Sequence, residues 1–187
     1  MHPETEQNKN PETGGVETEQ PGLDRYPFPL DAVVLAGTHQ NTKRLITGRN
    51  KAFLEVGGEV LVRRVIKALL EAETIDQIFV VGPADELLET LAGFPHRVHV
   101  IAQRGKMLTN AWAGIEAAED FRRNETDIPL HDRPLLAISC DLPLATGRSI
   151  DDFVVRCARE DLAADTPYAM LAGVVDAPSV EPFHPVD

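Results

Sequence analysis

The chain has 187 residues, a formal net charge of −12, 43% hydrophobic residues and 26% charged residues. This length fits one ordinary domain with a hydrophobic core, and the composition is typical of a soluble globular protein. No apolar run approaches the roughly 18 residues that a membrane-spanning helix needs, and the acidic charge disfavours a non-specific grip on DNA or RNA. We therefore expect a small-molecule partner and neither a nucleic acid nor a membrane.

The N-terminal segment differs in composition from the rest of the chain. Residues 1–24 carry six acidic side chains against one lysine and hardly any apolar ones. Such a segment cannot bury enough surface to offset its ordering entropy, so we predict a disordered acidic tail over 1–25 and one domain over 26–187. A partner-binding arm is the alternative for the tail.

Two features of the sequence bear on the compartment. The first residues lack the basic and apolar stretches of a signal peptide. The two cysteines, Cys140 and Cys157, lie in segments that have the pattern of buried core. The sequence therefore predicts reduced thiols and a cytoplasmic location.

Strand and helix patterns alternate along the domain. Apolar runs bounded by turn residues predict strands over 31–36, 77–81, 97–102, 134–140 and 168–175. Amphipathic spacing predicts helices over 60–72, 84–92, 109–123 and 149–161. Ser149 is expected to open the last helix in a capping box, and Trp112 is expected to lie in the core. This order predicts an α/β fold, a three-layer Rossmann-like, mostly parallel sheet with helices on both faces.

The end of the chain has no closing helix. Residues 176–187 are rich in proline and follow the fifth predicted strand directly. That strand would lack a covering layer on one side, so we predict that the domain is truncated at its C-terminus. A short disordered tail is the alternative.

The loop after the first predicted strand has the composition of a phosphate site. Leu35-Ala36-Gly37 leads into residues 37–51, which contain four basic side chains and no acid. Backbone N–H groups of a glycine-led loop and guanidinium groups both bind phosphate oxygens, and ligands of open α/β sheets lie beyond the carboxyl ends of the strands. The loop matches neither the Walker motif nor G-x-G-x-x-G, and a solvated basic loop is the alternative.

An acidic residue follows the fourth predicted strand, in Ser139-Cys140-Asp141-Leu142-Pro143. At that edge Asp141 is placed to hold Mg²⁺, which binds one or two carboxylates together with substrate phosphates. A loop-capping aspartate is the alternative. The adjacent carboxylate should raise the pKa of Cys140, so we expect a buried thiol and no nucleophile there.

The ordered set of these motifs resembles a known family. Leu35-Ala36-Gly37, a basic loop with Arg44, Lys51 before Phe53-Leu-Glu-Val-Gly-Gly58, and Cys140-Asp141-Leu-Pro143 resemble the MobA-like NTP transferases, which have a GT-A-like fold. The resemblance covers roughly residues 30–175 and is nearest to the branch of the molybdenum cofactor guanylyltransferases. It implies a nucleotidyltransferase that moves NMP from a nucleoside triphosphate to a small phosphorylated acceptor and releases pyrophosphate.

The resemblance also implies roles for individual residues. Arg44 and Lys51 would be catalytic and neutralise charge on the phosphates, and Asp141 would ligate Mg²⁺. Residues of two loops would bind the nucleotide: Leu35, Ala36, Gly37, Thr38, Gln103, Thr109 and Asn110. For Thr109 and Asn110, capping of the helix that begins there is the alternative.

The sequence departs from the family pattern at three points. Thr38 stands where the family commonly has a second glycine, and Asn50 precedes the lysine where Pro or Asp is usual. A second metal-ligating acid has no clear candidate before Asp187. Two other functions therefore stay open: a catalytically degenerate nucleotide-binding or interaction domain, and a GT-A glycosyltransferase that uses a nucleotide sugar. The glycosyltransferases generally have an Asp-x-Asp motif, which Asp141-Leu-Pro143 lacks.

Overall fold

A computed structural model describes residue 23 and residues 26–37, 50–123, 133–166 and 168–172. The elements in chain order are β1 (Leu30–Leu35), η3 (Lys51–Phe53), β2 (Glu55–Val56), β3 (Glu59–Val60), α1 (Leu61–Glu71), β4 (Ile75–Gly82), α2 (Ala84–Thr90), β5 (Val98–Ala102), α3 (Met107–Arg122), β6 (Leu135–Ser139) and α4 (Gly147–Ala163). Nearly all of the N-terminal segment for which we predict disorder, and the proline-rich end, lie outside the described residues.

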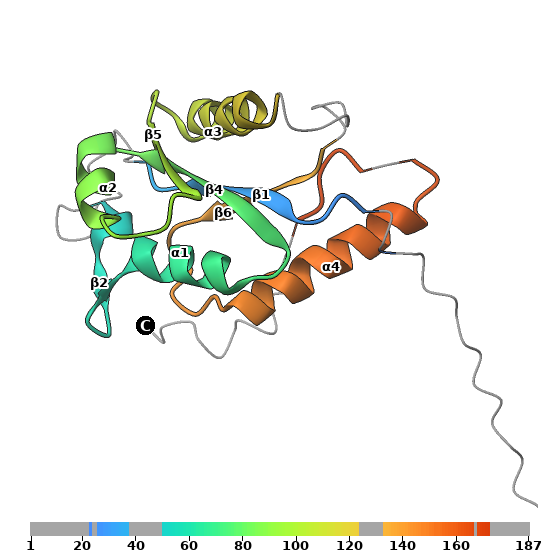
Figure 1. Ribbon diagram of the computed structural model, residues 1–187, viewed down its shortest axis with the longest axis horizontal. Helices are drawn as coiled ribbons and strands as arrows, with labels where there is room; N and C mark the ends of the chain where they lie inside the picture. Colours follow the sequence, from blue (N-terminus) through green and yellow to red (C-terminus); the bar gives the residue numbers. More distant parts are fainter. Residues whose placement is uncertain (1–22, 24–25, 38–49, 124–132, 167, 173–187) are drawn as a thin grey trace, which may run out of the picture.

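The main sheet contains four parallel strands in the order β5-β4-β1-β6. At its centre, Val34 of β1 pairs with Val80 of β4 and Ile138 of β6. Helix α3 covers one face of the sheet, and α1 and α4 cover the other (Figure 1). This arrangement confirms the predicted α/β fold with a parallel sheet and helices on both faces.

The core is built on both faces of β1 because that strand is buried on both sides. Ala32 and Val34 belong to the larger apolar cluster, together with residues of α1 and α4. Val33 belongs to the smaller cluster beneath α3, with Phe79 and Ala113. A central parallel strand that is covered on both faces accounts for the near-continuous apolar run in the sequence.

The strand order creates a switch point beside β1. From β1 the chain goes to β4 and β5 on one side, and then crosses to β6 on the other side of β1. The carboxyl ends of β1 and β6 therefore lie side by side at the point where the strand order reverses. Ligands of doubly wound sheets bind in the crevice at such a point.

The predicted fifth strand is wrong in the part that the structure describes. Residues 168–172 form no strand, and Tyr168 and Met170 are exposed. Alternating apolar residues predicted a strand here. None of the described strands pairs with this segment, so it lacks the backbone hydrogen bonds that a sheet position requires. The described sheet has four strands.

Three other predictions need correction. Trp112 is 62% exposed and not part of the core. The last helix begins at Gly147, because Thr146 is its N-cap and Ser149 is the third helical residue of the capping box. Cys140 is buried as predicted, whereas Cys157 is only partly buried.

Within the described part of the chain, no helix is long and apolar enough to cross a membrane.

An ion-pair cluster, which no sequence pattern predicted, holds the C-terminal end of α3 against the sheet. Arg122 donates to both carboxylate oxygens of Asp31, at 3.1 and 2.8 Å, and also contacts the Asp76 carboxylate. Asp31 is buried in β1, and its carboxylate also accepts from the Gln77 backbone N–H. Hydrogen bonds to Asp31 and Asp76 raise the pKa of Arg122, so the guanidinium stays charged.

Replacing Arg122 by methionine should destabilise the fold strongly. The change leaves the Asp31 carboxylate buried without its cationic partner, which typically costs about 3–5 kcal/mol. Urea denaturation measures the loss. The matched control is Arg123→Met, because Arg123 pairs with Asp120 where both side chains are mostly exposed. The control should change the free energy of unfolding by less than about 0.5 kcal/mol, and equal losses in the two variants would contradict the prediction.

Candidate nucleotide-binding and catalytic site

Backbone hydrogen bonds bring the ends of the four parallel strands to one edge. Beyond β1, Ala36 N–H donates to Val81 at 2.9 Å, and Gln103 N–H donates to Gly82 at 2.8 Å. On the other side, Cys140 N–H donates to Leu35 at 3.3 Å. These bonds extend the parallel register past the strands, so the segments that follow them start side by side.

Lys51 and Asp141 meet at this edge although 90 residues separate them in sequence. The Lys51 Nζ lies 3.3 Å from Asp141 Oδ2, and both side chains are partly exposed. Lys51 is the first residue of η3, and Asp141 comes two residues after the end of β6. The structure thus brings together two of the residues for which the sequence predicts catalytic and metal-binding roles.

Asp141 is ionised at neutral pH. The Ser139 hydroxyl donates a hydrogen bond to Asp141 Oδ1, and Lys51 adds a hydrogen bond and a positive charge. These contacts lower the pKa of Asp141 below its usual value, although partial burial opposes the shift. The site therefore presents a carboxylate and an ammonium group at the carboxyl ends of β1 and β6.

Cys140 takes no part in this chemistry. Burial, followed by the charge of Asp141, raises the pKa of the Cys140 thiol to about 11. At neutral pH the residue is a buried thiol and not a nucleophile, as predicted from its acidic neighbour.

Gly37 lies against the loop that follows β5. A Cβ at Gly37 would lie 2.5 Å from Asn110 Nδ2 and 3.3 Å from Gln103 Oε1. Real Cβ atoms do not approach another heavy atom to 2.5 Å, so any side chain at position 37 requires the Asn110 amide to shift. Gln103 is partly buried, and Leu35 and Ala36 extend β1 toward Gly37. The structure thus groups Leu35, Ala36, Gly37, Gln103 and Asn110.

Asn110 supports the loop before α3. Its side-chain oxygen accepts from Arg104 N–H at 2.8 Å and Gly105 N–H at 3.1 Å, and its Nδ2 donates to the Gly105 carbonyl at 3.3 Å. The N-cap of α3 is Lys106, so the capping alternative for Thr109 and Asn110 is wrong. Thr109 is exposed on the first turn of the helix. Nucleotide contacts by these residues stay predictions.

Replacing Gly37 by alanine should disturb this grouping. The new methyl group has to displace the Asn110 amide, and overpacking of this kind costs about 1–3 kcal/mol. Chemical denaturation of Gly37→Ala, Asn110→Ala and the double variant measures the coupling. We expect the double variant to lose less stability than the sum of the single losses, because Asn110→Ala removes the clashing amide. Strictly additive losses would contradict the close approach.

Two of the predicted site residues lie outside the described residues. Thr38 and Arg44 belong to the segment 38–49, so their predicted contacts with phosphate stay predictions.

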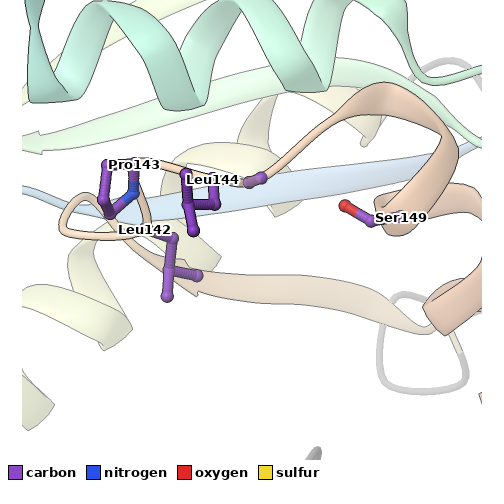
Figure 2. A pocket seen from close by; sticks show the side chains of 5 residues that line it. Leu142, Pro143, Leu144 and Ser149 are labelled. Atoms are coloured by element: carbon purple, nitrogen blue, oxygen red, sulfur yellow. The ribbon is translucent and has the colours of Figure 1, made fainter. Parts of the chain in front are cut away.

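Beyond Asp141 the chain forms a shallow pocket of about 370 Å³ before α4. Figure 2 shows Leu142, Pro143 and Leu144 on one side of this pocket and Ser149 on the other. Its lining contains no charged group, so it does not resemble a triphosphate site.

The sequence profile of the MobA-like NTP transferase domain matches residues 32–178, which include most of β1, Lys51 and Asp141. The match also covers β4, β5 and β6 and the helices on both faces of the sheet. The chain belongs to this family. This family assignment confirms the coarser part of the resemblance seen in the sequence.

Individual relatives are cytidylyltransferases. The chain is 29% identical over 133 residues to a 2-C-methyl-D-erythritol 4-phosphate cytidylyltransferase from Rhodococcus opacus (strain B4), covering 71% of this chain and 55% of that protein. It is 30% identical over 77 residues to the protein of the same name from Rhodococcus jostii (strain RHA1), covering 41% of this chain and 34% of that one. The chain thus spans about half or less of the length of these relatives.

The fold also matches a solved structure. The 4-diphosphocytidyl-2C-methyl-D-erythritol synthase from Anaerococcus prevotii superposes with a TM-score of 0.50 at 13% identity, over 69% of this chain and 50% of that one. This likeness supports the nucleotidyltransferase fold. None of these relatives specifically favours the guanylyltransferase branch that the resemblance suggested.

Proposed function

We propose that this chain is a nucleotidyltransferase domain that transfers NMP from a nucleoside triphosphate to a small phosphorylated acceptor. The observation that carries the proposal is the pairing of Lys51 with Asp141 at 3.3 Å, at the switch point beside Gly37. An ammonium group, a carboxylate and a glycine at the end of a parallel strand are the groups that triphosphate binding with a metal requires.

In the proposed reaction, an oxygen of the acceptor phosphate attacks the α-phosphorus of the nucleotide. A new P–O bond forms to the acceptor, the bond between the α-phosphorus and the bridging oxygen breaks, and pyrophosphate leaves. The protein needs no side-chain nucleophile for this displacement, because positioning and positive charge supply most of the catalysis. Lys51 neutralises negative charge on the reacting phosphates.

The Lys51–Asp141 ion pair is compatible with this role. Ion pairs between partly exposed side chains contribute only about 0–1 kcal/mol. Little free energy is therefore lost when the Lys51 ammonium exchanges the carboxylate for a phosphate oxygen. Release of Lys51 also frees an Asp141 oxygen for a cation.

The residues present fit Mg²⁺. The ion binds through one or two carboxylates, with water and substrate phosphates completing its shell, and Asp141 is an ionised carboxylate on the crevice. In the proposal Asp141 holds the ion, and bound Mg²⁺ supplies positive charge to the phosphate oxygens. Among the described residues, no three acidic, histidine or cysteine side chains converge to hold a metal, at this site or at another. The arrangement we propose is therefore one carboxylate plus substrate phosphates.

We propose CTP as the first nucleotide to test, because the named relatives are cytidylyltransferases. Pyrophosphate release should be assayed with CTP, GTP, ATP and UTP, each with Mg²⁺ and a panel of acceptors. The panel should contain 2-C-methyl-D-erythritol 4-phosphate, several sugar phosphates and molybdopterin. Acceptor-dependent release with one nucleotide supports the proposal. Tight nucleotide binding in calorimetry without release under any condition would instead favour a degenerate nucleotide-binding domain.

A further inference from the structure

Asn50, the residue before Lys51, makes two side-chain hydrogen bonds to backbone groups. Its Nδ2 donates to the Ala36 carbonyl at 2.9 Å, and its Oδ1 accepts from the Ala52 N–H at 3.2 Å. Ala36 ends the apolar run of β1, and Ala52 is the central residue of η3. One side chain therefore connects the end of the central strand to the short helix that carries Lys51.

Both anchor points lie in the core, since Ala36 and Ala52 are fully buried. Ala36 is also held by the bond from its N–H to Val81, and its carbonyl is closely packed, because a Cβ on Gly82 would lie 2.9 Å from that oxygen. A crowded backbone carbonyl needs a partner inside the protein, and the Asn50 amide supplies it. The hydrogen bond between Asn50 and Ala36 thus fixes the position of η3 relative to the sheet.

The ion pair with Asp141 cannot fix Lys51 by itself. Roughly half of the Lys51 side chain is exposed, and ion pairs between partly exposed side chains contribute little net free energy. The backbone of Lys51 has to be placed by other contacts if its ammonium group is to act on a reacting phosphate. The two Asn50 bonds hold the neighbours of Lys51 in sequence. One bond attaches Asn50 to Ala36, and the other attaches Ala52 to Asn50.

From this arrangement we propose that Asn50 is a positioning residue, which holds η3 against the end of β1 so that Lys51 faces the crevice opposite Asp141. The proposal rests on the proposed function, since Lys51 is its target. The chemistry requires an amide, because one side chain must donate to a carbonyl and accept from an N–H. Aspartate keeps the acceptor for Ala52 but places an oxygen against the Ala36 carbonyl oxygen.

The kinetic test is a double-mutant cycle of Asn50→Asp and Lys51→Met at saturating nucleotide and acceptor. Misplacing a catalytic group by about 1 Å can cost up to about 100-fold, so we expect Asn50→Asp to lower kcat by about tenfold or more. The KM for the nucleotide should change much less than kcat. In the Lys51→Met background, Asn50→Asp should change kcat by less than about twofold, because the group it positions is absent. Effects that multiply would overturn the proposal.

A structural measurement separates this proposal from the proposed function. Crystal structures of wild type, Asn50→Asp and Asn50→Ala without nucleotide give the Lys51–Asp141 separation directly. We expect that separation to exceed 4 Å in both variants, with β1 and β6 unmoved. An unchanged separation in both variants would overturn the positioning role even if wild type is active. Absence of transfer by wild type, with the expected displacement in the variants, would refute the proposed function alone.

Discussion

Replacing Lys51 by methionine is expected to lower kcat for nucleotidyl transfer by about 10²–10³-fold, the cost typical of removing one preorganised charge or donor from a transition state. Lys51 reaches the crevice from η3 and lies 3.3 Å from Asp141, and methionine keeps most of the side-chain volume without the charge. Steady-state pyrophosphate release measures the effect.

The chain offers a close control for this variant. Lys67 is about as exposed as Lys51 and also pairs with one carboxylate, that of Glu59, but it lies on α1. Lys67→Met should therefore leave kcat within about twofold of wild type, since the Lys67 ammonium pairs with Glu59 and not with Asp141. Wild-type turnover by Lys51→Met would show that the ammonium group has no role in the reaction.

The Asp141→Asn variant should lose both rate and affinity for Mg²⁺. Asparagine keeps the shape of the side chain but removes the charge that binds Mg²⁺. Loss of an outer-shell partner of a metal ligand costs about 10–100-fold in affinity or activity, so loss of the ligand itself should cost at least that much in kcat. The Mg²⁺ concentration for half-maximal rate should rise by about tenfold or more.

The comparison for this variant is Asp152→Asn on α4. Asp152 also pairs with a basic side chain, that of Arg156, at 3.0 Å, and it is mostly exposed. The free energy of unfolding should be similar in the two variants, whereas only Asp141→Asn should alter the Mg²⁺ titration of the rate. An unaltered Mg²⁺ titration in Asp141→Asn would assign the metal to other residues.

The sheet was predictable because its two central strands, β1 and β4, are mostly buried and the strands beside them are also largely apolar. β1, β4, β5 and β6 lie within two residues of the predicted bounds, since apolar runs that end in turn residues are specific for covered parallel strands. The segment 168–172 has similar side chains but lies at no sheet edge, and composition does not reveal whether a neighbouring strand exists.

Trp112 shows why helix periodicity misplaced one large side chain. Gly114 lies so close to the sheet that a Cβ would strike Val33, and Ala113 and Ala118 are buried beside it. Small residues bring α3 close to β1 and β4, and large residues then lie on the opposite side of the helix. The Ala-Gly pair was the signal in the sequence, but it is weaker than the signal of a tryptophan.

The candidate site was predictable in part. Sequence order placed Lys51 and Asp141 after strands that meet at one edge, and the structure brings them together. Their chemical roles stay predictions. The positioning role proposed for Asn50 could not be predicted from the sequence. It depends on a hydrogen bond to the Ala36 carbonyl, which lies 14 residues earlier in the chain and meets the Asn50 amide only in the folded protein. The Arg122–Asp31 contact spans 91 residues and was equally out of reach.

The central claim is that this chain transfers a nucleotidyl group to the acceptor. Transfer of the terminal phosphoryl group and hydrolysis of the nucleotide by water are the competing reactions. The most direct measurement uses CTP labelled at the α- or the γ-phosphate, with Mg²⁺ and 2-C-methyl-D-erythritol 4-phosphate or the acceptor that supports pyrophosphate release. We predict that the α-label appears in the acceptor product and the γ-label in pyrophosphate, and that Asp141→Asn forms both at least about 10-fold more slowly. Transfer of the γ-label to the acceptor, or release of inorganic phosphate alone, would contradict the claim.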